Sequence, residues 1–445
     1  MLTDPAASLR ITGSNQMAEE QTDRTKSDSF RWLRALSSGL ITGAADDDPS
    51  GVATYSQVGA KFGYATLWTM FLALPLMISI QIVSARIGRV TGKSLADNMR
   101  TQFPGWTVTS LVGALVVANV INLGADVGAM GSALQLLIGG PAVAYALGFG
   151  LLSTLLQVFI PFSKYSPILK ILTISLFAYV ATIFVVKVPW SQAIHGTFVP
   201  SFQWTADYAT AIVAILGTTI SPFLFFWQAA SEVEELKSDG PRRALAEKPS
   251  QGKDAIERIN VDTVIGMVFS NVVAFFIILT AAAVLHAHGK TDIHSSAEAA
   301  SALKPIAGPF AFWLFAGGII GTGMLAVPVL AGATAYAWAG ATGKVYGLEH
   351  KPQKAKFFYI ILIGAMAMGT GLNLTPIDPF KALYWSAVIN GVAALPIMVA
   401  VMLLAQKTAL MKNFAINAWV KWIAWLATAV MGAAAVVMFC TLGSG

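Results

Sequence analysis

The sequence has little charge and almost no cysteine. Asp, Glu, Lys and Arg make up 12% of the 445 residues, whereas 56% are hydrophobic; soluble domains carry about 25% charged residues. Low charge, long apolar runs and a mean hydropathy of +0.65 argue against a soluble enzyme and predict an all-α polytopic membrane protein. Cys440 is the one cysteine, which excludes an internal disulfide and a thiolate metal site.

Other functional groups are also scarce where an enzyme would need them. None of the five histidines falls inside a long apolar run, and the runs contain no pairing of nucleophile with acid or base. We therefore expect no enzymatic activity, no resident cofactor and no obligate protein partner. The net charge of +6 fits the basic residues that cytoplasmic loops carry, so no nucleic-acid partner is expected either.

Eleven apolar spans follow one another along the chain. They cover residues 36–57, 63–85, 105–138, 140–160, 166–188, 208–230, 260–285, 308–340, 357–373, 382–405 and 415–441. The spans 105–138 and 308–340 are longer than the roughly 20 residues that cross a bilayer, so we expect them to tilt or to extend past it. Residues 1–35 are polar and are predicted to form a disordered cytoplasmic tail.

The basic residues predict the orientation of these spans in the plasma membrane or bacterial inner membrane. With the amino terminus in the cytoplasm and the carboxyl terminus outside, most of the 29 Lys and Arg residues fall on the cytoplasmic side. The outside loops then hold Lys61, Lys187, Lys290, Lys304 and Lys381.

The first span contains three consecutive carboxylates near its middle. Asp46, Asp47 and Asp48 are followed at once by Pro49, Ser50 and Gly51. One Asp at the centre of a bilayer costs about 2.5–3.5 kcal/mol, so three must face water, a cation or protein. Because Pro lacks a helix donor and Gly weakens a helix, we expect a broken helix with bare carbonyls beside a carboxylate. Such a break is suited to binding a cation.

The sixth span shows a second interruption of the same kind. It reads Gly217-Thr218-Thr219-Ile220-Ser221-Pro222 at its centre. Each interrupted helix is the first of a set of five spans. Because five is an odd number, the second set begins on the opposite side of the membrane from the first. We therefore predict two inverted repeats, residues 36–188 and 208–405, with one extra span at 415–441. A simple proline kink is the plainer interpretation of Ser221-Pro222 taken alone.

Further polar residues lie inside or between the spans. Asn119, Asn122 and Asp126 share one helix face, and Asp126 is a candidate functional residue. Asn271 and Asn390 are expected to form hydrogen bonds between helices.

Two stretches outside the spans need separate interpretations. The charged stretch 231–258 is interpreted as a solvated cytoplasmic loop rather than a regulatory element. His286, His288 and His294 lie together in one outside loop, where three imidazoles could bind a metal but with poor preorganisation.

The residues around both breaks resemble a known family. Ala45–Tyr64 is similar to the first helix of the NRAMP divalent-metal transporters, which carry Asp-Pro-Gly-Asn where this chain has Asp-Pro-Ser-Gly. Residues 215–222 resemble their sixth helix, which usually ends Ala-Thr-Val-Met-Pro-His. The resemblance extends from about Leu36 to about Met402 and implies a LeuT-type fold and alternating access.

The resemblance also implies a ligand set, with departures. Asp48 matches the family's metal-binding aspartate. The family's Asn ligand falls at Gly51, its carbonyl-donating Ala at Thr218 and its Met ligand at Ser221. A thioether favours soft ions, whereas oxygen ligands suit hard cations such as Mg²⁺, which keeps several waters. With Asp47 beside Asp48, this set resembles that of the NRAMP-related magnesium transporters, a divergent branch of the family.

The groups usually associated with proton movement are also altered. The family's histidine after the sixth-helix proline falls at Phe223, and its third-helix Glu and Asp fall at Asp126 and Leu123. Asp126, Asn122, Asn390 and Thr219 are expected to line the route or to hold a water network. An inside-negative potential supplies about 4.6 kcal/mol per 100 mV to a divalent cation, so uptake without protons is feasible.

The sequence therefore predicts a secondary transporter that imports divalent cations, with Mg²⁺ favoured and Mn²⁺ as a further cargo. Its partners are then the metal ion as substrate and the lipid bilayer. One alternative is a proton-coupled Mn²⁺/Fe²⁺ importer in which Asp46, Asp47 and Asp126 replace the missing proton groups. A second, from another class, is a Na⁺-driven organic-solute symporter with the same two broken helices; three carboxylates at a break favour a cation over an organic anion.

Overall fold

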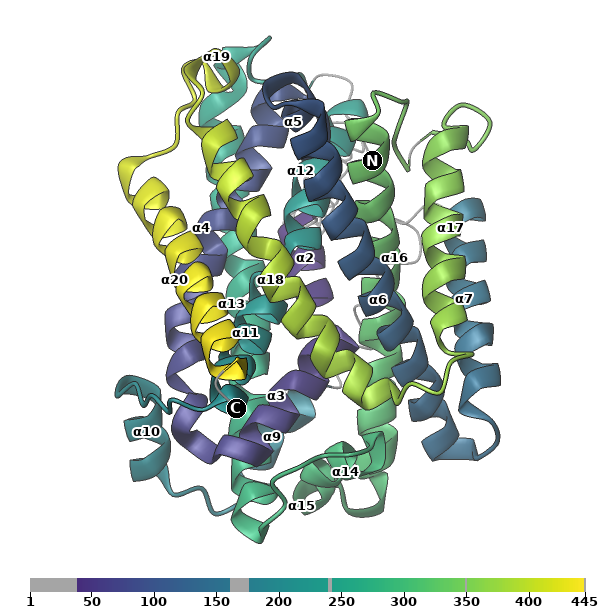
Figure 1. Cartoon of the computed structure of the whole chain (residues 1–445), viewed down its shortest axis with the longest axis vertical. Helices are drawn as coiled ribbons and strands as arrows, with labels where there is room; N and C mark the ends of the chain where they lie inside the picture. Colours follow the sequence, from purple (N-terminus) through teal and green to yellow (C-terminus); the bar gives the residue numbers. More distant parts are fainter. Residues whose placement is uncertain (1–37, 161–175, 239–241, 349, 444–445) are drawn as a thin grey trace, which may run out of the picture.

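A computed structural model describes residues 38–160, 176–238, 242–348 and 350–443, and these residues form helices and no strand. Most of the helices run along the long axis of the molecule (Figure 1). The α-helices are α2 (Ser38–Asp46), α3 (Pro49–Phe62), α4 (Trp68–Thr91), α5 (Leu95–Gln102), α6 (Gly105–Ile138), α7 (Ala142–Phe159), α9 (Phe177–Ile183), α10 (Trp190–Phe198), α11 (Ala206–Thr219), α12 (Pro222–Ser238), α13 (Gly252–Val284), α14 (Ser296–Ala300), α15 (Lys304–Ala307), α16 (Ala311–Ala341), α17 (Lys356–Leu372), α18 (Pro379–Ala405), α19 (Thr408–Met411) and α20 (Ala418–Leu442). Short 3₁₀ turns connect some of them, among them η1 (Gly63–Thr66) and η4 (His286–His288).

These helices agree with most of the predicted spans. Eight segments of the described chain are long and apolar enough to cross a membrane by length and composition, and α17 is a shorter apolar helix. The two spans expected to be long form α6 and α16, with 34 and 31 residues. Of the span 166–188 the structure describes residues 176–188, which contain α9. The predicted tail, residues 1–35, lies outside them.

Both predicted helix breaks are present. The first separates α2 from α3 at Asp47 and Asp48, and the second separates α11 from α12 at Ile220 and Ser221. In Figure 1, α2 and α12 lie nearer the upper end of the bundle, whereas α3 and α11 lie nearer the lower end. The two breaks therefore lie inside the bundle rather than at its ends.

Two basic residues that the sequence predicts for opposite sides of the membrane lie on helices at opposite ends of the molecule. The helices α5 and α19 lie at the upper end in Figure 1, whereas α10, α14 and α15 lie at the lower end. Arg100 belongs to α5, and Lys304, one of the basic residues predicted for the outside, begins α15. This arrangement agrees with the separation of charge that the sequence predicts; which end faces the cytoplasm stays a prediction.

The interpretation of residues 231–258 as a solvated loop is wrong for most of the stretch. α12 continues to Ser238, and α13 begins at Gly252. Arg258 pairs with the fully buried Glu232 at 2.6 Å and with Glu235 at 3.0 Å, which joins the two helices. The sequence signal was misleading because charges that pair across helices look the same as charges in a solvated loop.

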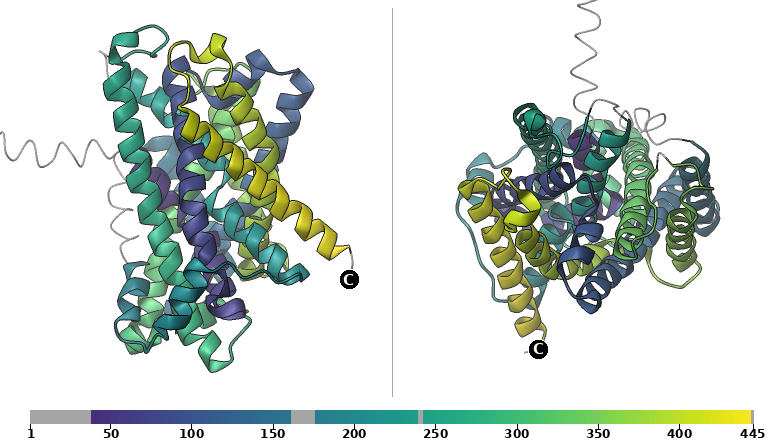
Figure 2. Two further views of the ribbon diagram at one scale, coloured as in Figure 1. Left: turned by 90° about the vertical axis from the view of Figure 1, so that its left-hand side faces the viewer. Right: turned by 90° about the horizontal axis from the view of Figure 1, so that it is seen from above.

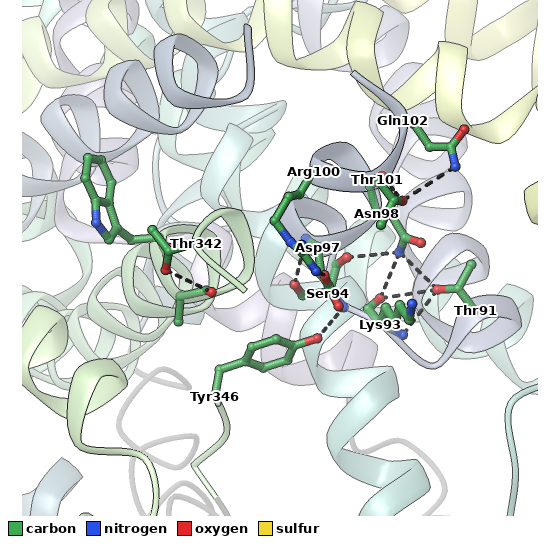
Figure 3. A network of polar contacts seen from close by, with 12 residues as sticks. Thr91, Lys93, Ser94, Asp97, Asn98, Arg100, Thr101, Gln102, Thr342 and Tyr346 are labelled. Carbon is green, nitrogen blue, oxygen red and sulfur yellow. Dashed lines mark hydrogen bonds and ion pairs between the residues drawn. The ribbon is translucent and has the colours of Figure 1, made fainter. Parts of the chain in front are cut away.

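The turn between α4 and α5 is held by a polar network at the upper end of the bundle (Figure 3). Ser94 caps α5, and its backbone amide donates to the hydroxyl of Tyr346. The Asn98 side-chain amide donates to Thr91 and to the carbonyls of Lys93 and Ser94. The Asn98 bonds hold the turn itself, and the bond from Ser94 to Tyr346 joins it to the segment that follows α16.

The outer helices expose apolar side chains, as a surface in contact with lipid requires. In Figure 2, α20 lies at one edge of the bundle, and α7 and α17 lie at the opposite edge. Leu151 on α7, Met368 on α17 and Trp422 on α20 are 62%, 64% and 68% exposed. Exposed apolar area of this kind suits a bilayer and not water.

Glycines bring the broken helices into direct contact with two long neighbours. A Cβ on Gly43 of α2 would overlap the backbone of Gly266 on α13. On the other side, a Cβ on Gly217 of α11 would overlap the carbonyl of Ala387 on α18, and one on Gly391 would lie 2.7 Å from Val213 O. α2 therefore rests on α13 and α11 rests on α18, each by backbone-to-backbone contact.

We expect Gly43→Ala to destabilise the fold by roughly 1–3 kcal/mol, because the added methyl group must push α2 away from α13. The measurement is the thermal unfolding temperature of the purified protein in detergent. Gly364→Ala is the matched control, since a Cβ on this α17 glycine meets nothing within 4 Å. Equal melting temperatures for the two variants would contradict the close contact.

Candidate cation site at the two helix breaks

Asp48 is positioned as the cap of α3. Its Oδ1 accepts from the Gly51 amide at 2.7 Å and from the Ser50 hydroxyl at 2.7 Å. Pro49 fits the first position of α3 because its missing N–H is not needed there. The same missing N–H leaves the carbonyl of Ala45, four residues earlier, without a helix donor. The Asp-Pro sequence thus supplies both a fixed carboxylate and a bare carbonyl.

The other oxygen of Asp48 faces two neighbouring helices. Asp48 Oδ2 accepts from the Asn122 side chain on α6 at 2.9 Å, and Asn122 Oδ1 accepts from the Ser386 hydroxyl on α18 at 2.7 Å. Asn122 therefore orients the carboxylate, in agreement with its predicted place at the site. Ser386 was missed, because a single serine in an apolar span carries no distinctive sequence signal.

The second break presents oxygen atoms in the same way. Pro222 has no N–H, so the carbonyl of Thr218 lacks its helix donor. The Ser221 hydroxyl lies 2.8 Å from that carbonyl and 2.7 Å from the carbonyl of Gly217. A hydroxyl has one proton, so it serves only one of these acceptors at a time. Thr219 donates to the carbonyl of Ile215 in its own helix at 2.9 Å.

The two breaks approach each other closely at Gly51. A Cβ on Gly51 would lie 3.1 Å from Thr218 Oγ1, 3.3 Å from the carbonyl oxygen of Asp46 and 3.4 Å from the ring of Tyr55. Because glycine has no side chain, oxygen atoms from α11 and from the end of α2 meet at this point. The start of α3 at Gly51 and the end of α11 at Thr218 therefore face each other in close approach.

Asp126 lies near this meeting point, on the same face of α6 as Asn122. Its side chain is fully buried, and neither oxygen has a hydrogen-bond partner among the described residues. Its electrostatic neighbours are Asp48 and the Ser50 amide. A cavity of about 790 Å³ reaches α6 at Gly128, two residues further along, and extends to Asp378 at the start of α18.

The remaining intramembrane amides have different surroundings. Asn271 donates to the carbonyl of Met70 at 3.1 Å, so its predicted role between helices is confirmed. Asn119, on the face shared with Asn122, donates to Thr334 on α16 at 3.0 Å. Asn390 is buried, and its Oδ1 has no partner among the described residues.

Asp46 and Asp47 point to another helix. Ser270 Oγ on α13 lies 2.6 Å from Asp46 Oδ2 and 3.1 Å from Asp47 Oδ1. The sequence predicts Asp47 as a ligand beside Asp48. In the structure, the Asp47 carboxylate contacts Ser270 on α13.

The site carries a large excess of buried negative charge. Asp46, Asp47, Asp48 and Asp126 are 1%, 1%, 2% and 0% exposed. Within the described residues none of them forms an ion pair. Two carboxylates 5 Å apart repel each other by about 3 kcal/mol at an effective dielectric constant of 20, in addition to the cost of leaving water. Cations or protons must balance this charge.

His286, His288 and His294 do not form an alternative metal site. In the described part of the chain, no three or more His, Cys, Asp or Glu side chains are arranged to hold a metal ion. His286 Nδ1 lies 2.8 Å from the carbonyl of Ala60, and His288 Nδ1 lies 2.6 Å from that of Val284.

Since no such group of three is found at the breaks in the described residues, a cation there would need hydroxyl, carbonyl or water oxygens in addition to carboxylate. Such donors suit hard divalent cations.

Comparisons with known proteins agree with this geometry. The family model described as "Natural resistance-associated macrophage protein-like", Nramp, matches residues 39–441. The divalent metal cation transporter MntH of Verminephrobacter eiseniae is 26% identical over 294 residues, which cover 64% of this chain and 63% of that protein. MntH of Pectobacterium carotovorum is 28% identical over 298 residues, covering 66% of this chain and 68% of that protein. The match thus spans about two thirds of these relatives.

Solved structures show the same fold. A manganese transporter of Eremococcus coleocola superposes with a TM-score of 0.69 at 19% identity, covering 93% of this chain and 87% of that one. Mhp1, a nucleobase-cation-symport-1 family transporter, gives a TM-score of 0.58 at 12% identity, covering 92% and 93%. The predicted all-helical, LeuT-type architecture is confirmed, whereas the count of eleven spans stays a prediction. The prediction of a transporter family rather than an enzyme is confirmed as well. The chain belongs to the Nramp family.

Proposed function

We propose that this membrane protein imports divalent metal cations by alternating access, with Mg²⁺ as the principal cargo and Mn²⁺ as a second one. The observation that carries the proposal is the buried carboxylate of Asp48 at the point where the two helix breaks meet. The names of the curated relatives, divalent metal cation transporters, support the substrate class.

In this proposal Asp48 supplies the charge that attracts the cation. Its Oδ2 accepts one hydrogen bond, from Asn122, and keeps a second lone pair for an ion or its water. The carbonyls of Gly51 and Thr218 and the hydroxyl of Ser221 supply further oxygen contacts, directly or through water. Asp47 adds negative charge next to them. Asp126 and Asn122, with Asn390 and Thr219, line the route or hold its water.

The donor set favours Mg²⁺ over thiophilic metals. Each proposed ligand is an oxygen atom, and Mg²⁺ is usually held through one or two carboxylates with several waters retained. Soft ions gain most from a sulfur ligand, and Ser221 provides a hydroxyl at the break of α11 and α12. Hydrated Mg²⁺ therefore fits this set better than Cd²⁺ or Fe²⁺.

The membrane potential suffices to drive this uptake. A divalent cation that moves inward gains about 4.6 kcal/mol per 100 mV, which corresponds to an accumulation of roughly 10³-fold. Proton coupling is not required for uptake of an abundant ion, so we propose transport without protons.

The contacts of the broken helices suggest how access alternates. α2 and α3 rest on α13, since a Cβ on Gly43 or on Gly59 would overlap its backbone, whereas α11 rests on α18. Movement between these two supports would open the site first to one side and then to the other. The proposed units are the repeats 36–188 and 208–405, with 415–441 as an added span and the amino terminus in the cytoplasm.

We expect Asp48→Asn to abolish uptake while the protein still folds, because asparagine also caps helices. The loss should exceed the roughly 10- to 100-fold that removal of an outer-shell partner costs. The assay is Mg²⁺ influx into proteoliposomes with a fluorescent indicator. Ser50→Ala is the control, since it removes one hydrogen bond from Asp48 and keeps the charge. Unchanged influx with Asp48→Asn would refute the proposed ligand.

We expect Gly51→Asn combined with Ser221→Met to shift preference from Mg²⁺ toward Mn²⁺ and Cd²⁺ by roughly tenfold or more, because it restores an amide and a thioether. The new side chain at position 51 requires small shifts, since its Cβ meets Thr218 Oγ1 at 3.1 Å. The measurement is competition between the metals for uptake.

A matched control separates ligand chemistry from size in that experiment. Gly51→Ser with Ser221→Thr adds bulk at the same two positions but keeps oxygen donors only. Equal selectivity of the two double variants would contradict the soft-ligand argument.

A second candidate function, proton-coupled import of Mn²⁺ or Fe²⁺, is favoured by two other observations. Asp126 is buried without a partner next to Asp48. The thioether of Met130 also packs near the first break: a Cβ on Gly323 would lie 2.5 Å from Met130 Sδ and 3.3 Å from Pro49 Cγ.

The two functions differ in the pH change that accompanies uptake. Mn²⁺ influx into proteoliposomes loaded with a pH-sensitive dye should leave the internal pH unchanged if transport is uncoupled. Acidification in proportion to Mn²⁺ influx, lost with Asp126→Asn, would instead establish the second function. Met130→Leu should leave Mg²⁺ influx unchanged in the first case and should lower Mn²⁺ influx in the second.

A further inference from the structure

We propose a second cation site beside the one at Asp48, formed by Asp46, Asp47 and Ser270 on the side of the first break that faces α13. It would take a hard divalent cation with oxygen ligands. The inference adds to the proposed transport function, and its test distinguishes failure of one from failure of the other.

Two carboxylates converge on one hydroxyl at this place. Ser270 Oγ lies 2.6 Å from Asp46 Oδ2 and 3.1 Å from Asp47 Oδ1. The hydroxyl has a single proton and can donate to only one of them at a time. The other carboxylate oxygens, Asp46 Oδ1 and Asp47 Oδ2, have no hydrogen-bond partner among the described residues. The carboxylate oxygens of Asp46 and Asp47 therefore lie together with too few hydrogen-bond donors around them.

A third side chain provides independent support for a ligand here. Tyr55 on α3 is fully buried, and its hydroxyl forms no hydrogen bond with Asp46 or Asp47; its hydrogen-bonding neighbour is the Thr218 side chain. Asp46, Asp47 and Asp48 all lie near this hydroxyl. A buried hydroxyl that is not bonded to the carboxylates beside it is suited to an ion or to water bound to an ion.

The backbone contact between α2 and α13 creates the arrangement. A Cβ on Gly43 would overlap the backbone of Gly266. One turn further along each helix, Asp46 and Asp47 on one side reach Ser270 on the other. A larger residue at either glycine would separate these groups, so the same close packing that fixes α2 also assembles the oxygen cluster.

The cluster is distinct from the Asp48 site because its side chains point to another helix. Asp48 is held by its own helix α3 and by Asn122 of α6. Asp46 and Asp47 are held by Ser270 of α13. Two groups of carboxylates thus leave the same break in two directions, one toward α6 and one toward α13.

The charge of the cluster indicates the ion. No Lys, Arg or His in the described residues forms an ion pair with Asp46 or Asp47, and both side chains are 1% exposed. A divalent cation matches two carboxylates in charge, and hydroxyl and water oxygens complete its coordination. An ion bound there would join α2 to α13 next to the transported cation.

The test counts bound Mn²⁺ on the purified full-length chain in detergent, by equilibrium dialysis with electron paramagnetic resonance as the readout. We expect two Mn²⁺ per wild-type chain. Asp46→Asn combined with Asp47→Asn should leave one, and Asp48→Asn should also leave one. Asp207→Asn, which removes an exposed carboxylate from the pair with Lys61, is the matched control and should leave two.

The alternative outcomes separate the two proposals. One Mn²⁺ per wild-type chain, lost only with Asp48→Asn, overturns this inference and leaves the transport site intact. One Mn²⁺ lost only with the double variant supports the cluster and removes Asp48 as the proposed transport ligand. Two Mn²⁺ in the double variant overturn the inference.

A further variant keeps the inference testable if the double variant does not fold. Ser270→Cys places a thiol between the two carboxylates and should raise Cd²⁺ affinity at least tenfold over the wild type. Ser386→Cys, on α18 next to Asn122, is the comparison at the Asp48 site. Unchanged Cd²⁺ affinity in Ser270→Cys would overturn the inference.

Discussion

The missing backbone N–H groups of Pro49 and Pro222 are the constraint on which the site depends. Each proline leaves a carbonyl four residues earlier without its helix donor, inside a bundle where water is scarce. The two breaks differ in what happens next. At the first, the Ala45 carbonyl stays without a helix donor while Asp48 accepts from an amide of the new helix, and at the second, the Ser221 hydroxyl is placed to donate to the Thr218 carbonyl. Both solutions leave oxygen atoms facing the same place, which is why a cation can be bound there.

The surrounding helices serve to keep those oxygen atoms in position. Glycine contacts bring α2 against α13 and α11 against α18, so each broken helix is held by a continuous one. The chain from Ser386 through Asn122 to Asp48 then fixes the direction of the carboxylate. The cost of burying four aspartates without ion pairs is acceptable only if cations or protons occupy the bundle during the working cycle.

Much of the fold could be predicted from the sequence, because apolar length and proline position are local properties. The prolines predicted both breaks, and the length of the apolar run predicted the bounds of α6. Contacts between distant residues were not: Ser386 and Ser270 are ordinary serines in apolar spans, and only packing brings them to Asp48, Asp46 and Asp47. The same reason explains why residues 231–258 were misinterpreted, since the pairing of Arg258 with Glu232 depends on how α12 meets α13. The ligands of the cation and the two repeats stay predictions.

The most direct test of the central claim is the position of the transported ion. Crystals of the protein soaked with Mn²⁺ would reveal it by anomalous scattering at the manganese absorption edge. We expect a peak within direct or water-mediated reach of the Asp48 carboxylate, between the start of α3 and the end of α11. A peak confined to the histidines that follow α13, with none at the breaks, would contradict the account.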